Sequence, residues 1–196
     1  GILMQDQVDI LSTNGAINIT ATGSPSSTAG SGHFGIEMRQ RSNEIRSTSG
    51  PITINATAAP LTIGDTNTGF QMTGTAGATS QIFSTGGAIS VTAIGAPNGG
   101  SNNFGMEIDG ASNNFLRIQS QNSINIDGAA ASSGTGSDNV GVSIGQSATI
   151  RALGAGTVNI TGTSGGNGSR NRGIHRSSNS EVTSISGSIT LTGTGG

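Results

Sequence analysis

The chain has 196 residues, of which 31% are hydrophobic, 3% aromatic and 9% charged, and its formal net charge is −2. Large apolar side chains are too few to fill a broad globular core, which favours a thin one. The basic residues are all arginines and acids outnumber them, so no basic field exists to attract nucleic acid or an anionic membrane. Cysteine is absent, which excludes disulfides and thiolate metal sites, and no apolar stretch is long enough for membrane insertion.

A fixed period organises the chain. A glycine followed by an apolar residue recurs six times, and the spacings between these glycines are 34, 34, 36, 36 and 32 residues. Such a period is typical of repeat proteins, in which each unit packs on its neighbours. The glycines are Gly1, Gly35, Gly69, Gly105, Gly141 and Gly173. They divide one solenoid segment, residues 1–196, into the repeats 1–34, 35–68, 69–104, 105–140, 141–172 and a partial 173–196.

Each repeat opens with a short predicted strand. The residue after the glycine is apolar, and so is the residue two places further on, which predicts a strand with one buried side. The second of these positions is occupied by Met4, Met38, Met72, Ile108, Ile144 and Arg176. Arg176 breaks an otherwise apolar column, and we expect the strand to turn outward there.

A second strand is predicted around one aliphatic residue per repeat. These residues are Ile10, Ile45, Ile82, Ile118, Ile150 and Val182. Their spacing from the first strand varies by three or four residues between copies, as expected where loops accept insertions.

The third strand gives the strongest signal, with segments such as GAINITA from Gly15 and GPITINA from Gly50. Apolar and polar residues alternate, and β-branched side chains dominate the apolar positions, as a pleated strand prefers. The predicted core residues are Ile17, Ile52, Ile89, Ile124, Val158 and Ile189, followed two places later by Ile19, Ile54, Val91, Ile126, Ile160 and Leu191.

Loops are predicted after each third strand, where some ten to twelve residues are mainly Gly, Ser, Thr, Asn and Ala. Four of the five returns carry an asparagine two places before the restarting glycine, and both residue types accept the positive φ of a sharp corner. We therefore expect the corner at these positions. The asparagines are Asn67, Asn103, Asn139 and Asn171.

Together these elements predict an all-β fold, a right-handed parallel β-helix (β-solenoid) of about six rungs with three short strands each and Gly/Ser/Asn-rich loops. No copy can bury its apolar face alone, so the copies must stack and corresponding strands must pair in parallel. The right hand follows from the preference of parallel crossovers. An antiparallel sandwich is the alternative, and the steady period and the lack of two-residue hairpin turns count against it.

The restarts HFGIEM and NFGMEI, the isoleucine-centred second strand and the closing GSITLTGTGG resemble the repeat arrays of filamentous-haemagglutinin-like bacterial surface proteins. The resemblance implies a structural segment of a secreted fibre or adhesin stalk, extracellular or on the cell surface, whose partners are further copies or repeats and cell-surface or matrix glycans. The pattern contains no catalytic signature and implies neither enzymatic activity nor a cofactor.

Carboxylates were considered as catalytic groups. Glu37 and Glu107 occupy the same outward position of the first strand, with Gln71 between them. Two rung spacings separate the two carboxylates by about 9.6 Å, which is at the limit for an inverting glycosidase pair. A solvated face is the better interpretation, and a polysaccharide-degrading enzyme is the least favoured function.

Metal sites were considered at a few acids and at both histidines. Asp109 and Asp127 could approach across a rung, Asp65 lies in a loop, and His33 and His175 each stand alone. None of these residues matches a calcium-loop spacing or a zinc ligand set. We therefore predict no metal site.

The outward positions of the third strand form two polar files, which invite an ice-binding or carbohydrate-binding hypothesis. The candidate residues are Thr20, Thr53, Thr92, Thr161, Thr190 and Thr192. Because Asn, Asp and Ser interrupt the threonines, side-chain ladders on a polar exterior are the simpler interpretation.

The arginines fall into two groups. Arg46, Arg117 and Arg151 flank the second strand, and the other five lie near the first, where they could bind an acidic glycan. Pairing of arginine with Glu37 or Glu44 is expected to be exposed and weak.

Overall fold

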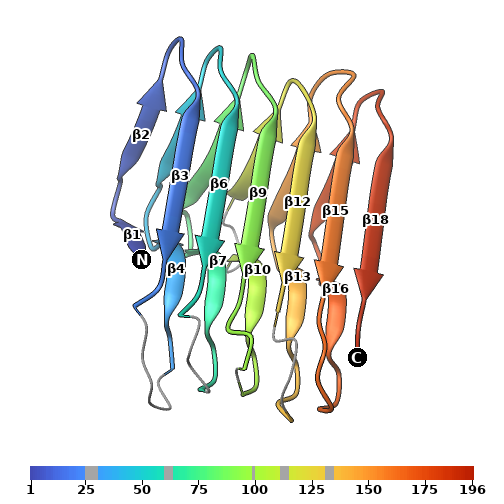
Figure 1. The fold of residues 1–196 in the computed structure, drawn as a ribbon. Coiled ribbons are helices and arrows are strands. Elements are labelled where there is room, and N and C mark those ends of the chain that lie inside the picture. Colours follow the sequence, from blue (N-terminus) through green and yellow to red (C-terminus); the bar gives the residue numbers. More distant parts are fainter. Residues whose placement is uncertain (25–30, 60–63, 99, 111–114, 131–134) are drawn as a thin grey trace.

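The computed structural model describes residues 1–24, 31–59, 64–98, 100–110, 115–130 and 135–196. All regular elements in these ranges are β-strands, arranged in three six-stranded parallel sheets (Figure 1). The predicted all-β parallel solenoid is therefore confirmed, with three strands in each turn. The middle parts of several predicted loops, at 25–30, 60–63, 99 and 131–134, lie outside the described residues.

Each sheet collects one strand from every turn. The first sheet contains β1 (Ile2–Gln5), β4 (Phe34–Arg39), β7 (Thr68–Gly74), β10 (Phe104–Gly110), β13 (Val140–Ile144) and β16 (Arg172–Arg176). The second sheet contains β2 (Asp9–Ser12), β5 (Glu44–Ser47), β8 (Thr79–Ser84), β11 (Phe115–Ser120), β14 (Ala148–Ala152) and β17 (Glu181–Ser184). The third sheet contains β3 (Ile17–Thr22), β6 (Ile52–Thr57), β9 (Ile89–Ile94), β12 (Ile124–Ala129), β15 (Val158–Thr163) and β18 (Ile189–Thr194).

The pairing register follows the sequence repeat. In the first sheet the residue after each restarting glycine pairs with its counterpart one turn away, as Ile2 does with Ile36 and Phe70 with Met106. In the second sheet the aliphatic residues predicted to centre the strands are likewise in register, from Ile10 with Ile45 to Ile150 with Val182. Insertions between strands therefore leave the stacking of side chains undisturbed.

The core is a narrow file of aliphatic side chains enclosed by the three sheets. Ten of the twelve predicted third-strand core residues are buried, including Ile52, Ile54 and Ile89 at 0% exposure. The prediction is wrong for Ile189 and Leu191, which are 43% and 49% exposed. Both continue the inward columns, but β18 is the edge strand of its sheet and, among the described residues, no further turn covers them.

Arg176 also departs from expectation. The strand does not turn outward, because β16 stays paired with β13 as far as Arg176 opposite Ile144. The guanidinium instead extends to the loop that follows β16, where Nε lies 3.1 Å from Ser180 Oγ and Nη2 lies 2.5 Å from the Ser180 carbonyl oxygen. The long side chain thus leaves the apolar column without disturbing the backbone ladder.

The restarting glycines are required by a close approach of two backbones. A Cβ on Gly35 would lie 2.6 Å from the backbone nitrogen of Thr57, and one on Gly69 would lie 2.5 Å from that of Ile94. These glycines do not have positive φ, so the expectation of a corner conformation there is wrong. The start of each first-sheet strand instead packs directly on the end of a third-sheet strand, which keeps the column thin.

Among the described residues, no helix has the length and apolar character needed to cross a bilayer. The right-handed sense of the coil stays a prediction.

Candidate functional site

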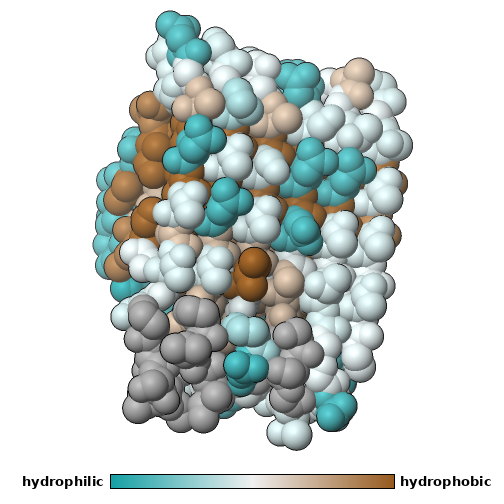
Figure 2. All heavy atoms as spheres, in the orientation of Figure 1, coloured by the Kyte–Doolittle hydropathy of each residue, from teal (hydrophilic) through white to brown (hydrophobic). Residues whose placement is uncertain are grey.

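The outward face of the third sheet is a flat, polar surface, and Figure 2 shows it in the foreground. Two files of side chains run along it in register. The first file is Asn18, Thr53, Ser90, Asn125, Asn159 and Thr190, and the second is Thr20, Asn55, Thr92, Asp127, Thr161 and Thr192. Four of the six predicted binding threonines thus share the second file, and Thr53 and Thr190 belong to the first.

A shallow depression of about 170 Å³ lies between the two files at the middle turns. Its outward side chains are Ser90, Thr92, Asn125, Asp127, Asn159 and Thr161. Within it, Asn159 Nδ2 donates to Asn125 Oδ1 at 3.0 Å, a cross-strand amide contact of the expected ladder type. The surface therefore offers hydroxyl, amide and carboxylate groups on an open sheet, without a deep cleft.

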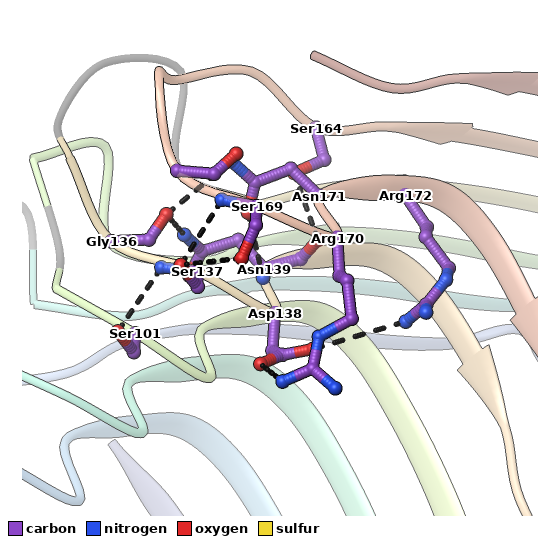
Figure 3. A network of polar contacts seen from close by, with 11 residues as sticks. Ser101, Gly136, Ser137, Asp138, Asn139, Ser164, Ser169, Arg170, Asn171 and Arg172 are labelled. Carbon is purple, nitrogen blue, oxygen red and sulfur yellow. Dashed lines mark hydrogen bonds and ion pairs between the residues drawn. The ribbon is translucent and has the colours of Figure 1, made fainter.

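The four corner asparagines form a buried ladder that the sequence prediction missed, and Figure 3 shows its last two members, Asn139 and Asn171. The backbone nitrogen of each of the first three donates to Oδ1 of the next. The distances are 2.8 Å from Asn67 to Asn103, 2.9 Å from Asn103 to Asn139 and 3.0 Å from Asn139 to Asn171. A buried amide in this position satisfies a backbone donor of the neighbouring turn, which would otherwise cost free energy.

Each asparagine also forms a hydrogen bond within its own corner. The Nδ2 of Asn103 donates to the carbonyl oxygen of Gly100 at 2.9 Å, and that of Asn139 donates to Gly136 at 3.0 Å. His33 occupies the same column in the preceding turn, and its backbone nitrogen donates to Asn67 Oδ1 at 3.1 Å. His33 is thus a corner residue at the head of the ladder.

Positive φ falls one residue earlier than predicted. The residues that adopt it are Thr66, Asn102, Asp138 and Arg170, each directly before a ladder asparagine, and Gly32, before His33. The asparagines themselves are not among the residues with positive φ. Their role is hydrogen bonding across turns, and the conformational strain of the corner is carried by the preceding residue.

A second row of side chains at the same corner runs in the opposite direction. The backbone nitrogen of Ser101 donates to Asp65 Oδ1 at 2.6 Å, that of Ser137 to Ser101 Oγ at 3.1 Å, and that of Ser169 to Ser137 Oγ at 3.1 Å. Asp65 therefore accepts a hydrogen bond within the corner.

Serines form a third ladder where the second strand turns into the third. Ser84 Oγ accepts from the backbone nitrogen of Gly87 at 3.0 Å and donates to the carbonyl oxygen of Gly50 one turn earlier, also at 3.0 Å. Ser47 and Ser184 make the same pair of contacts in their turns. Ser120 repeats the inter-turn donation, to Gly87 at 2.8 Å.

The asparagine ladder and the serine ladder between the second and third strands each have a sequence signal. The asparagine corner reads GDTNTG, GSNNFG, GSDNVG and GSRNRG from Gly64, Gly100, Gly136 and Gly168. The serine corner reads STNG, STSG, STGG and SISG from Ser12, Ser47, Ser84 and Ser184. Recurrence of one polar residue at one place in most repeats, between apolar columns, is the signal that predicts a stacked hydrogen-bonding ladder.

Glu37 and Glu107 do not form a closely spaced pair of carboxylates. Glu37, Gln71 and Glu107 are in register as predicted, with the glutamine between the acids. Gln71 Nε2 donates to Glu107 Oε2 at 2.5 Å, and Arg39 lies 3.3 Å from Glu37. Burial raises the pKa of the Glu107 carboxyl above its ordinary value, the Gln71 hydrogen bond lowers this pKa, and nearby Asp109 raises it further.

The residues considered as metal ligands lie in separate surroundings. Asp109 Oδ1 accepts from the backbone nitrogen of Gln146 at 3.1 Å, whereas Asp127 is exposed on the third sheet. His175 lies on β16 opposite Ser143. The described ranges contain no group of three or more His, Cys, Asp or Glu residues placed to share a metal ion.

Ion pairs occupy part of the arginine set. Arg170 lies 2.7 Å and Arg172 4.0 Å from Asp138, beside the asparagine ladder (Figure 3). The predicted pairing of Glu37 is with Arg39, whereas Glu44 Oε1 accepts from Gln81 Nε2 at 2.7 Å. These contacts are partly exposed and contribute little to stability.

No protein-family model matches this chain, and comparisons with curated proteins and with solved structures yield no similar protein. The structure supports the resemblance to filamentous-haemagglutinin-like repeats only as far as a three-sheet β-solenoid.

Replacing Asn103 by alanine should lower the free energy of unfolding by about 2 to 4 kcal/mol, because the Asn67 nitrogen and the Gly100 carbonyl both lose a buried partner. Denaturant unfolding measures the change. The matched control is Asn55→Ala, on the exposed face of the third sheet, for which we expect a change below about 0.5 kcal/mol. Equal effects at the two positions would contradict the structural role of the ladder.

Glu107 predicts a pH dependence of stability. Because the pKa of Glu107 is raised in the folded state, the contribution of its protonated carboxyl to the stability of the fold is fully present below the ordinary pKa of about 4.5. This contribution is lost as the pH rises through the raised pKa. Glu107→Gln should therefore raise the melting temperature at pH 7 and flatten its decline above pH 4.5, while the amide still accepts from Gln71. Glu181→Gln, at an exposed position of β17, serves as the charge control. An unchanged pH profile in Glu107→Gln would refute the assignment.

Proposed function

We propose that the chain is a structural segment of a secreted β-solenoid fibre or adhesin stalk, extracellular or on the cell surface. The observation that carries the proposal is the continuity of columns through all six turns. The aliphatic files of the third sheet run in register through all six turns. The asparagine corner recurs at four consecutive returns, and the serine corner recurs in every turn except the fifth, where Ala152 replaces the serine. A column with this property supplies length and stiffness through repetition of one unit.

The last described turn leaves apolar side chains of the inward columns uncovered. Ile189 and Leu191 continue inward columns yet remain about half exposed on β18, and β16, β17 and β18 present an unpaired edge in all three sheets. A further turn, from the same polypeptide or from a second copy, would cover these side chains and pair these edges. Neighbouring repeats and further copies are accordingly the proposed partners.

Electron microscopy of the purified chain tests the proposal. We expect straight filaments of constant width, with an axial spacing of about 4.8 Å per turn in fibre diffraction. Leu191→Asp should abolish filament growth while leaving the folded column intact, because it places a charge in the apolar rim that the next turn must cover. The adjacent outward change Thr192→Asp is the control and should leave growth unchanged. Discrete monomers at all concentrations, or equal effects of the two variants, would count against a fibre role.

Carbohydrate or ice binding by the third sheet is the second candidate function. The observation in its favour is the depression between the two polar files, whose hydroxyl and amide groups are held at fixed spacing by the sheet. Thr92→Tyr should fill this depression and abolish binding to a neutral-glycan array or inhibition of ice recrystallisation. Thr22→Tyr, on the same sheet but outside the depression, should leave both readouts unchanged. Absence of both activities in the unmodified chain would exclude this function.

A further inference from the structure

The outward face of the second sheet differs in chemistry from the other two faces. Its two files are Asp9, Glu44, Gln81, Arg117, Thr149 and Glu181, and Leu11, Arg46, Phe83, Gln119, Arg151 and Thr183. Phe115 adds a further aromatic side chain beside the first file, and it is 54% exposed. Arginine and aromatic side chains are the residues most often found to dominate binding at interfaces.

Three arginines of this face are uncommitted. Arg46, Arg117 and Arg151 have no carboxylate partner among the described residues, whereas Arg39, Arg170 and Arg172 are all used in ion pairs near the first sheet. Their in-register neighbours are neutral or apolar. Arg46 lies between Leu11 and Phe83, Arg117 between Gln81 and Thr149, and Arg151 between Gln119 and Thr183.

The aromatic side chains are placed beside these cations. The Arg117 guanidinium lies 5.0 Å from the centre of the Phe115 ring, a cation–π contact that orients both groups at the surface. Next to Arg46, a depression of about 210 Å³ is lined by Leu11, Ser12, Thr13, Arg46 and Thr48. Phenylalanine side chains therefore adjoin the guanidinium groups at two places, Phe115 beside Arg117 and Phe83 beside Arg46.

The direction of the surface follows from the stacking. Arg46, Phe83, Arg117 and Arg151 belong to four consecutive turns, β5, β8, β11 and β14. At about 4.8 Å per turn, the outer two arginines are about 14 Å apart along the axis. A ligand that reaches all of them must be extended and lie parallel to the axis.

We propose that this arginine–phenylalanine face, made of Arg46, Phe83, Phe115, Arg117 and Arg151, binds a linear acidic polysaccharide along the solenoid axis. The planar guanidinium groups pair with carboxylate or sulfate substituents, the phenylalanine rings cover the apolar faces of sugar rings, and the Gln81 and Gln119 amides bond to hydroxyl groups. A nucleic-acid surface is basic throughout, whereas this face also carries Asp9, Glu44 and Glu181, so nucleic acid is disfavoured and the acidic groups of the polysaccharide must lie beside the three arginines. The proposal is independent of the fibre role, because it concerns the isolated chain.

Titration calorimetry of the chain with a galacturonate hexasaccharide tests the proposal. Arg117→Gln and Arg151→Gln introduce the residue that the preceding turn carries in register, Gln81 and Gln119 respectively, so the column should fold unchanged, as circular dichroism can verify. Each variant should weaken binding by about tenfold. Phe115→Thr, which copies Thr79 from the preceding turn, should also weaken binding.

The controls separate this face from others. Arg170→Gln removes the same charge at the asparagine corner and should leave affinity unchanged, as should Thr92→Tyr on the third sheet. A neutral glucose hexasaccharide should not bind, and salt should weaken binding of the acidic one. The proposal is overturned if the acidic hexasaccharide does not bind, if the arginine variants bind it as well as the unmodified chain does, or if oligothymidylate binds more tightly at the same residues.

Discussion

Parallel pairing of each strand with its counterpart one turn away is the interaction on which the whole structure depends. It sets a spacing of about 4.8 Å between equivalent residues. Within a sheet, the neighbours of a side chain are therefore the equivalent side chains of the turns above and below. An apolar residue is buried by the apolar residues above and below it, and a polar corner residue bonds to the next corner. One constraint thus produces both the aliphatic files and the ladders of asparagine and serine.

The ladders explain how a chain with so few large apolar side chains can form a column. Close packing at the restarting glycines brings the first sheet against the end of the third, as at Gly35 and Thr57, and leaves room for only a thin core. The asparagine and serine side chains at the corners then form hydrogen bonds with backbone groups that would otherwise be buried without partners. Glycine, serine and asparagine are therefore structural residues here, in the same sense as the isoleucines.

Three outward faces with different chemistry follow from this frame. On the first sheet, charged side chains contact other side chains of the same sheet, as Glu107 does with Gln71 and Glu37 with Arg39. The third sheet presents hydroxyl and amide files, and the second presents unpaired arginines beside phenylalanine. The inward positions and corners maintain the column, so the residue type at outward positions can change from turn to turn, as it does in the second sheet. A stiff support with separately variable surfaces is well suited to the structural role that we propose.

The sequence by itself determined the period, the three strands in each repeat and the inward columns, because alternation and stacking act on residue type at fixed places in the repeat. It also contained the asparagine and serine corners, but the asparagines were predicted only as corner residues with positive φ, and the serine corner was not predicted. Only the structure shows Asn103 bonded to both neighbouring turns. The reason for Gly35 likewise required the structure, since a close approach between backbones far apart in a repeat leaves no pattern beyond the glycine itself. Tertiary structure alone decided three further features: the exposure of Ile189 and Leu191, the continued pairing of Arg176, and the grouping of Arg117 with Phe115. Each of them depends on whether a neighbouring turn is present among the described residues and on which side chains that turn carries.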